Sequence, residues 1–308
     1  MATTLATQAS AFYGFSRGTQ ATLSVAQPLT VALLADASPV PWQLAVLTLG
    51  CFAGFFSVFA VNDLLDARLD QRRFRNLRSH QGPDLDAAGG RHPLAQGRLT
   101  QRAAVLWVVG LALMAAGICA LFSWASLLLF LIAVVLEIVY CKLATVTAFK
   151  TVISGVMVAV GAMVGWFALN QTIEIVTLIL LAVWLAAWEI GGRNIPNDLA
   201  DLDEDVHLGL ATVPVRCGAR TSARLSCAAL VAAACAYIAL MCTAFPPSTA
   251  IGAICLILAV LAAGYSLILP GRALLRSPDG STALATFNRT SLHPALALGV
   301  VIVGLSLR

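Results

Sequence analysis

The sequence predicts an all-α integral membrane protein, a bundle of about nine transmembrane helices. Hydrophobic residues make up 59% of the 308 residues and charged residues only 11%, against about 45–50% and about 25% in soluble domains. The basic residues collect on one side of the predicted spans, and more than half of the acidic residues fall into two similar motifs. So low a charge content excludes a soluble domain, a disordered chain, a coiled coil and a nucleic-acid-binding protein.

Nine apolar segments are long enough to cross a bilayer core of about 30 Å, which takes about 20 residues. The first segment is the weakest because Gln27 and Pro28 interrupt it. We expect residues 1–308 to form one membrane domain, with a flexible N-terminal segment over residues 1–18. The expected spans are 19–36, 42–63, 102–122, 124–141, 148–169, 173–193, 222–244, 249–270 and 291–307.

The basic residues predict the orientation of these spans. If the N-terminus is cytoplasmic, the N-terminal segment, connections and helix ends on that side hold 18 of the 19 Lys and Arg residues. Short loops rich in Lys and Arg stay in the cytoplasm. The net charge of +4 therefore reflects membrane topology, and we expect a multi-pass protein, in the cytoplasmic (inner) membrane if the source is bacterial, with its N-terminus on the cytoplasmic side.

Two acidic motifs lie on this basic side. The first reads Asn-Asp-Leu-Leu-Asp-Ala-Arg-Leu-Asp over residues 62–70, and the second reads Asn-Asp-Leu-Ala-Asp-Leu-Asp-Glu-Asp over residues 197–205. Each copy stands at the end of a span that runs in the same direction, so the two copies can face each other across one cavity mouth. A single copy is equally well explained as a solvated helix end, but two copies in register indicate a functional site.

The spacing within the motifs favours a metal site. In each copy the Asn and two of the acids stand four residues apart and share one helix face: Asn62, Asp66 and Asp70 in the first, and Asn197, Asp201 and Asp205 in the second. Carboxylates stacked in this way repel one another unless a cation lies between them. Mg²⁺ binds oxygen ligands and substrate phosphates, so the facing motifs are suited to hold Mg²⁺ ions around a diphosphate.

The motifs resemble those of the UbiA superfamily of intramembrane prenyltransferases, which includes 4-hydroxybenzoate polyprenyltransferases. Residues 91–98 read Arg-His-Pro-Leu-Ala-Gln-Gly-Arg, which is similar to the R-P-L-x-x-G-R segment that follows the family's first motif. The run after the second motif is also similar, through Gly209, Thr212, Pro214, Val215, Arg216 and Gly218. The resemblance covers the chain from about residue 42 to its end.

This resemblance implies helices around a central cavity, a cytoplasmic cap and Mg²⁺-dependent transfer of an isoprenyl group from an allylic isoprenyl diphosphate to an aromatic or other lipophilic acceptor. Its partners would be that donor, the acceptor and membrane lipid. Of the six metal ligands named above, the acids Asp66, Asp70, Asp201 and Asp205 would be catalytic. Candidate diphosphate ligands are Arg68, Arg91, Lys142, Lys150 and Arg193, and candidate substrate contacts are Asp63, Tyr140, Glu189 and Asp198.

Simpler explanations of single residues stay open. Each basic residue alone is also explained as an anchor on the positive-inside face, and Tyr140 as an interfacial aromatic residue. Glu189 either positions an acceptor or forms a structural ion pair with Arg193, since an acid inside a span needs a partner.

Two departures from the family pattern bear on the substrate and the cap. The first span lacks the Arg that ubiquinone-pathway members carry shortly before a Pro, which argues against an acceptor bound through the carboxylate of 4-hydroxybenzoate. The connection over residues 71–90 is enlarged and too polar to enter lipid. We therefore expect it to belong to the cap, where mobile segments often gate substrate entry.

Two other functions remain as alternatives. An intramembrane terpene cyclase of the same superfamily would use the same metal and diphosphate site without an acceptor. A transporter or cation channel would use acidic clusters to guard a pore. Transporters usually show matching halves and broken helices near the bilayer midplane, whereas the repeat here is a short motif at one interface.

Overall fold

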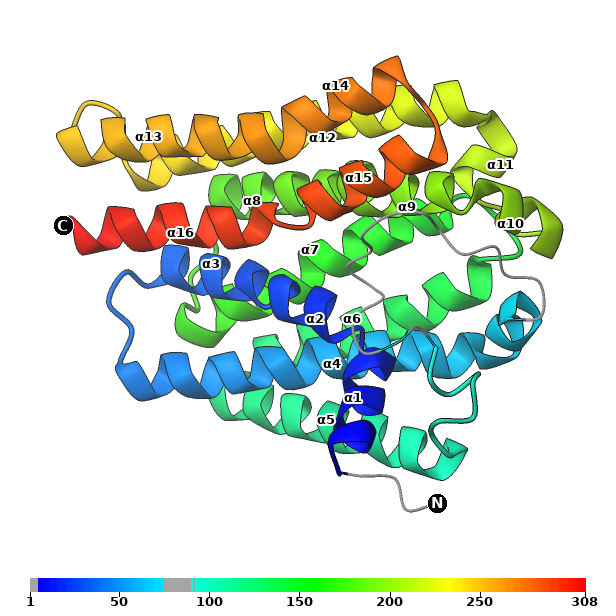
Figure 1. Cartoon of the computed structure of the whole chain (residues 1–308). Coiled ribbons are helices and arrows are strands. Elements are labelled where there is room, and N and C mark those ends of the chain that lie inside the picture. The colour runs from blue at the N-terminus through cyan, green and yellow to red at the C-terminus, as the bar shows by residue number, and fades with distance from the viewer. Residues whose placement is uncertain (1–4, 75–89, 91) are drawn as a thin grey trace.

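The computed structural model describes residues 5–74, 90 and 92–308, with the backbone alone for residues 66–74. This part of the chain is a bundle of helices without strands, and most of the helices run side by side (Figure 1). Eight helical segments within it are long and apolar enough to cross a membrane: Pro41–Leu65, Gln101–Phe122, Trp124–Leu143, Lys150–Leu169, Ile175–Ala200, Ala219–Ala244, Ala250–Arg276 and Gly280–Ser306.

The helices follow one another along the chain, and residues 75–100 stand between α4 and α5. In the first half of the chain they are α1 (Leu5–Phe15), α2 (Gly18–Ser24), α3 (Ala26–Ala35), α4 (Pro41–Phe74), α5 (Gln101–Phe122), α6 (Trp124–Leu143) and α7 (Lys150–Leu169). In the second half they are α8 (Ile175–Trp188), η2 (Glu189–Asn194), α9 (Ile195–Ala200), α10 (Leu202–Leu208), α11 (Val213–Cys217), α12 (Ala219–Ala244), α13 (Ala250–Ala263), η3 (Gly264–Ile268), α14 (Leu269–Arg276), α15 (Gly280–Thr290) and α16 (His293–Ser306).

The expected first span, 19–36, is a pair of short helices, α2 and α3, broken at Val25. Pro28 explains the break, because it has no N–H to donate to the carbonyl of Ser24 and so interrupts the helical hydrogen-bond ladder. Gln27 and Thr30 of α3 are fully buried, where α3 packs against α7 and α16. The pair therefore lies inside the bundle, although neither helix is long enough to span a bilayer alone.

Residues 5–15 form α1 in place of the flexible segment expected over residues 1–18. Ala11 and Phe15 are buried in a cluster with Ala60 of α4 and with Ala104 and Val108 of α5. This apolar contact explains the difference, because it holds α1 across α4 and α5 (Figure 1).

Two π-helical turns interrupt the longer spans. The turn η2 joins α8 to α9, and η3 joins α13 to α14. A π-turn widens the helix by one residue per turn and is common at functional sites. The hydroxyls of Ser226 and Thr290 donate to the carbonyl oxygens of Gly191 and Gly192 in η2, and so satisfy acceptors that this wider turn offers. Gly191 is required there, since a Cβ at this position would lie 2.6 Å from the carbonyl oxygen of Ser226.

The short helices α9, α10 and α11 gather at one end of the bundle, beside the junction of α14 and α15 (Figure 1). The start of α15 packs against the end of α9, and Asp279 caps α15 by accepting a hydrogen bond from the backbone N–H of Thr282 at 2.9 Å. Hydrogen bonds from Ser281 and Thr282 hold the pKa of Asp279 below its ordinary value. This cap fixes α15 beside the second acidic motif.

Gly165 sets the distance between α7 and α3. A Cβ at Gly165 would lie 2.0 Å from the carbonyl oxygen of Pro28, whereas a Cβ at Gly161, one turn earlier, would meet only Ala133 at 3.9 Å. We expect Gly165→Ala to destabilise the protein by about 1–3 kcal/mol, because backbone would have to shift, and Gly161→Ala to change stability little. Thermal unfolding in detergent tests this pair, and equal midpoints would contradict the close approach.

Candidate active site

A polar cavity lies between α2, α3, α4, α6, α7, η2, α9 and α15. Its volume is about 710 Å³, including the open space at its mouth, which lies within the usual range of ligand pockets. Asn62 of the first motif and Asn197 of the second both line it. The structure therefore places the start of each motif on the wall of one cavity, in agreement with the expectation from the repeat.

The wall at the first motif is a network of charged and amide side chains. Arg17 donates from Nη2 to Asn62 Oδ1 and to Asp63 Oδ1, both at 3.2 Å. The Nδ1 atom of His92 lies 3.6 Å from Asp63 Oδ2. On the other side, Asn62 Nδ2 donates to Glu137 Oε1 at 3.2 Å. Asp63 thus joins the N-terminal segment to the segment that begins at residue 92, and Asn62 faces the cavity.

The second motif crosses a helix junction and still keeps its register. Asp201 ends α9 and precedes α10, with φ −96° and ψ 12°. Its N–H donates to Asn197 O at 3.1 Å, and the N–H of Asp205 donates to Asp201 O at 2.9 Å. These bonds preserve the i, i+4, i+8 relation expected from the sequence. Asp201 and Asp205 are buried on this short segment, next to the cavity wall at Asn197.

Lys150 and Asp198 form a buried ion pair behind that segment. Lys150 Nζ donates to Asp198 Oδ1 at 3.0 Å, and both side chains are less than one-tenth exposed. The ammonium also lies over the ring of Tyr140, 5.1 Å from its centroid. Lys150 therefore starts α7 as the partner of a motif acid, and neither member of the pair lines the polar cavity in the described structure.

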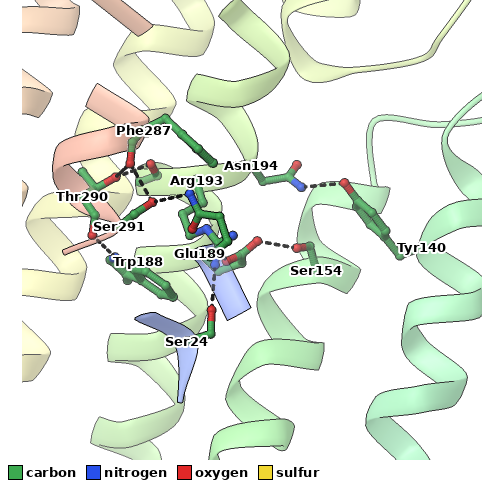
Figure 2. Close-up of polar contacts among 12 residues, drawn as sticks. Ser24, Tyr140, Ser154, Trp188, Glu189, Arg193, Asn194, Phe287, Thr290 and Ser291 are labelled. Carbon is green, nitrogen blue, oxygen red and sulfur yellow. Dashed lines mark hydrogen bonds and ion pairs between the residues drawn. The ribbon is translucent and has the colours of Figure 1, made fainter. Parts of the chain in front are cut away.

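The π-turn η2 contributes Glu189, Arg193 and Asn194 to the cavity wall, and Figure 2 shows the polar contacts of these three residues. Glu189 Oε1 accepts a hydrogen bond from Ser154 of α7 at 2.8 Å, and its Oε2 lies 3.8 Å from Arg193 Nε. Arg193 Nη1 donates to Ser24 Oγ at 3.3 Å. The two residues are thus ion-paired and each is anchored to a different helix.

Aromatic rings surround the Arg193 guanidinium. Its central carbon lies 5.5–5.7 Å from the ring centroids of Trp188, Phe59 and Phe287. Cation–π contacts at this range are attractive, more so where water is excluded, and Arg193 is only 8% exposed. The rings hold the guanidinium in one place beside the cavity.

Asn194 links the π-turn to α6 and α7 (Figure 2). Its Nδ2 donates to the Tyr140 hydroxyl at 3.1 Å, and its Oδ1 accepts from Thr151 Oγ1 at 2.7 Å. Tyr140 therefore lines the cavity with its hydroxyl held toward η2.

Some of the predicted site residues lie outside this description. Arg91 is not among the described residues, and only the backbone of Asp66, Arg68 and Asp70 is described, on α4, where the spacing keeps Asp66 and Asp70 on the helix face of Asn62. Lys142 is exposed at the end of α6 and does not line the cavity. Of the remaining predicted residues, Asn62, Asn197, Arg193, Tyr140 and Glu189 line the cavity, and Asp63 contacts Arg17 beside it.

Sequence reasoning missed six polar residues on the cavity wall: Glu137 and Asn194, whose contacts are described above, and Arg17, Ser24, Gln27 and Ser154. The signal was present for two of the last four. Arg17 is the one basic residue before the first predicted span, and Gln27 interrupts that span. Ser24 and Ser154 carry no such mark, since Ser is common in membrane helices.

The donor set of the two motifs fits a hard divalent cation. No three His, Cys, Asp or Glu side chains cluster tightly enough to hold a metal within the described residues, and the side chains of Asp66 and Asp70 are not among these. An asparagine of each motif, Asn62 and Asn197, lines the cavity, and the buried carboxylates Asp201 and Asp205 follow Asn197 at helical spacing. Oxygen ligands of this kind suit Mg²⁺ rather than a thiol- or imidazole-binding metal.

A second, apolar cavity adjoins the polar one. It also measures about 710 Å³ with its open mouth, and Phe55, Val58, Met157 and Val158 line both. From there it extends along α4, α5 and α7 to Leu47, Phe122 and Ala168. Leu47 lies fifteen residues before Asn62, or about 22 Å along the helix. A ligand with a polar head and a long apolar tail matches the two cavities together.

Comparison with known proteins identifies the family. The profile of the UbiA prenyltransferase family matches residues 24–292. The chain belongs to the UbiA prenyltransferase family. A 4-hydroxybenzoate octaprenyltransferase of Chromohalobacter salexigens is 25% identical over 186 residues, which is 60% of this chain and 57% of that protein. This chain therefore spans somewhat more than half the length of the curated relative that it matches.

Solved structures of UbiA proteins share the fold. A UbiA homolog from Aeropyrum pernix K1 superposes with a TM-score of 0.73 at 18% identity, covering 92% of this chain and 97% of that one. A digeranylgeranylglyceryl phosphate synthase gives 0.68 at 16% identity, covering 98% and 99%. A UbiA homolog from Archaeoglobus fulgidus bound to DMAPP and Mg²⁺ gives 0.66 at 15% identity, covering 96% and 99%. Family membership and the eight apolar helical segments make this UbiA protein a multi-pass integral membrane protein.

Proposed function

We propose that this UbiA-family protein transfers an isoprenyl group from an allylic isoprenyl diphosphate to an aromatic or other lipophilic acceptor, in a reaction that requires Mg²⁺. The observation that carries the proposal is the pair of adjoining cavities, one polar between Asn62 and Asn197 and one apolar behind it. The DMAPP and Mg²⁺ in the related Archaeoglobus fulgidus structure support it, as does the octaprenyltransferase relative.

Different charged and amide side chains would bind the metal ions and the diphosphate of the donor. Asn62, Asp66, Asp70, Asn197, Asp201 and Asp205 would hold Mg²⁺ ions at the cavity mouth. The Mg²⁺ ions would supply Lewis-acid stabilisation of the diphosphate as it leaves. Arg17 and Arg193 line the same cavity and add donors to the phosphate oxygens, which Arg matches well. Arg68 and Arg91 are further candidate ligands on the first-motif side.

The apolar cavity protects the reacting carbon. The C1–O bond of the donor breaks with its electron pair on the diphosphate, and positive charge develops on the allylic carbons. A ring carbon of the acceptor then bonds to C1 and releases a proton to a basic oxygen of the cavity. Phe55, Val58 and Met157, which stand where the cavities join, exclude the water that would otherwise trap the cation.

The orientation follows the basic residues. We propose that the N-terminus and the motif end of the bundle lie in the cytoplasm, because 18 of 19 Lys and Arg residues belong to that side, as in short cytoplasmic loops generally. In a bacterial source this would be the cytoplasmic membrane. Labelling of the exposed Cys217, the last residue of α11, by a membrane-impermeant maleimide tests it. We expect labelling in inside-out vesicles and protection in intact cells, and the reverse pattern would contradict the orientation.

Diphosphate release tests the activity. Purified protein is given dimethylallyl, geranyl and geranylgeranyl diphosphate, with and without Mg²⁺, and with and without a panel of phenolic and lipid acceptors. Release that needs both Mg²⁺ and an acceptor would support transfer. Release without an acceptor would select the terpene-cyclase alternative, and no release from any donor would count against both enzymes.

Filling the apolar cavity should discriminate among donors by length. Gly161 lines this cavity and has room for a side chain, so we expect Gly161→Leu to lower turnover of geranylgeranyl diphosphate at least about tenfold relative to dimethylallyl diphosphate. Gly117 of α5 is exposed and lines neither cavity, so Gly117→Leu is the matched control. An equal effect on short and long donors would show that the tail lies elsewhere.

A further inference from the structure

Four exposed arginines stand on two neighbouring helices at the motif end of the bundle. Arg220 and Arg224 belong to the first two turns of α12, and Arg272 and Arg276 belong to α14. The members of each pair are four residues apart, so they share one face of their helix. We call these four residues the arginine surface.

The two helices contact each other beside these arginines. A Cβ at Gly271 of α14 would lie 3.1 Å from Leu230 Cδ1 and 3.6 Å from Cys227 Sγ, both on α12. Arg272 directly follows Gly271, and Arg224 precedes Cys227 by three residues. Because α12 begins and α14 ends at the same end of the bundle (Figure 1), the arginines of the two helices form one surface rather than two.

The arginine surface has little acidic charge around it. Residues 206–278 hold five Arg and no Asp, Glu or Lys, and within the described residues none of the four arginines forms an ion pair. The next acid, Asp279, serves as the N-cap of α15. Asp203 and Glu204 stand on α10, which packs against α9 and α11. Such an excess of positive charge fits an anionic partner.

An apolar stripe leads away from the arginine surface along the outside of the bundle. Its four members are between 49% and 63% exposed and follow one another at intervals of four residues along α13, η3 and α14: Ile257, Leu261, Tyr265 and Leu269. They share one face, which continues three residues later at Arg272. The stripe covers about 18 Å along the helix axis, which exceeds the depth of one leaflet in a bilayer core of about 30 Å. Cations at one end of an apolar stripe match an amphipathic anion, whereas an acidic protein would leave the stripe without a partner.

We propose that the arginine surface binds the headgroup phosphate of an anionic phospholipid, and that an acyl chain of this lipid lies along the apolar stripe. Arg presents a planar fork of N–H donors that matches two oxygens of a phosphate group. Basic pockets between membrane helices bind anionic lipid headgroups in other membrane proteins, whereas a single positive-inside anchor requires no second arginine beside it. The proposal goes beyond prenyl transfer and does not depend on it, because lipid binding involves no turnover.

Native mass spectrometry of the delipidated protein in a neutral detergent tests the proposal. The probes are phosphatidylglycerol, which carries a negative charge, and phosphatidylcholine, which is neutral overall, with the same acyl chains. We expect phosphatidylglycerol to bind at least about tenfold more tightly, since each Arg near an anionic headgroup contributes about fivefold. Inorganic phosphate at the concentration of the lipid should not displace it, because inorganic phosphate has no acyl chain to place on the stripe.

Two double variants locate the bound lipid by removing the arginines of one helix each: Arg220→Gln with Arg224→Gln on α12, and Arg272→Gln with Arg276→Gln on α14. We expect each to weaken phosphatidylglycerol binding at least about fivefold and to leave phosphatidylcholine binding unchanged. Arg102→Gln with Lys142→Gln is the matched control. It also removes two exposed positive charges, at the start of α5 and the end of α6, and should bind both lipids as the unmodified protein does.

Four results would overturn the proposal: equal binding of the two lipids to the unmodified protein, displacement of phosphatidylglycerol by inorganic phosphate, an unchanged affinity in either arginine variant, or an equal loss in the control variant. The comparison of the two lipids needs no variant. Substitutions at exposed positions usually change stability little, so the four variant positions can be tested in folded protein.

Discussion

Turnover is expected to fall at least about a thousandfold in Asp201→Ala and in Asp66→Ala, while both proteins stay folded in the membrane. Asp201 is buried and keeps helical register with Asn197 on the cavity wall, and Asp66 follows Asn62 by four residues on α4. If these acids hold Mg²⁺, their loss removes the charge that stabilises the departing diphosphate. Losing such electrostatic stabilisation lowers turnover by about this thousandfold factor in comparable sites.

Asp203→Ala is the matched control for this pair. Asp203 lies in the same motif on α10 but is exposed, so its replacement should leave turnover within about twofold, as for most surface positions. Diphosphate release at saturating donor and Mg²⁺ is the measurement. Full activity in Asp66→Ala or Asp201→Ala would contradict the assignment of the metal to these motifs.

The second large effect concerns stability. Lys150→Met leaves Asp198 buried without the ammonium that lies 3.0 Å from it, and breaking a buried ion pair from one side typically costs about 3–5 kcal/mol. The double variant Lys150→Met with Asp198→Leu should recover much of that loss, since both charges are then gone. Lys142→Met is the matched control, because Lys142 is exposed at the end of the neighbouring helix.

Unfolding by denaturant in mixed micelles measures these differences. The result also separates the two roles considered for Lys150. A protein that is as stable as the unmodified one but has lost donor binding would mean that Lys150 acts as a free diphosphate ligand, and the ion pair would then not be its resting state. A large loss of stability that Asp198→Leu relieves would mean that Lys150 acts on the site through the second motif.

The features that repeat in sequence were the ones that could be predicted. The register of the two motifs places Asn62 and Asn197 on helix faces, and the structure brings both to one cavity. The apolar segments also predicted the bundle, because a span of about 20 apolar residues has few alternatives to a membrane helix. The adjoining apolar cavity was not predicted, since its shape depends on how α4, α5 and α7 pack.

Local irregularities were harder to foresee. The π-turn η2 depends on Gly191 and Gly192, whose lack of side chains is visible in the sequence, but also on hydroxyls of Ser226 and Thr290 far along the chain. The break between α2 and α3 follows from Pro28, yet the burial of Gln27 depends on how α3 packs against α7 and α16. The ion pair of Arg17 with Asp63 joins residues that are 46 positions apart in the sequence. Helical spacing predicts contacts only between near neighbours in the sequence, so it could not predict this one.

Mg²⁺-dependent binding of an inert donor analogue tests the central claim most directly. Geranyl thiodiphosphate carries a C1–S bond in place of the C1–O bond and resists cleavage, so its dissociation constant reports the site without chemistry. We predict that Mg²⁺ tightens its binding to the unmodified protein at least about a hundredfold over EDTA, because the motif acids repel a bare diphosphate. The gain should be absent in Asp201→Ala and retained in Asp203→Ala. Equal affinity with Mg²⁺ and with EDTA, or an unchanged gain in Asp201→Ala, would contradict a metal–diphosphate site between the two motifs.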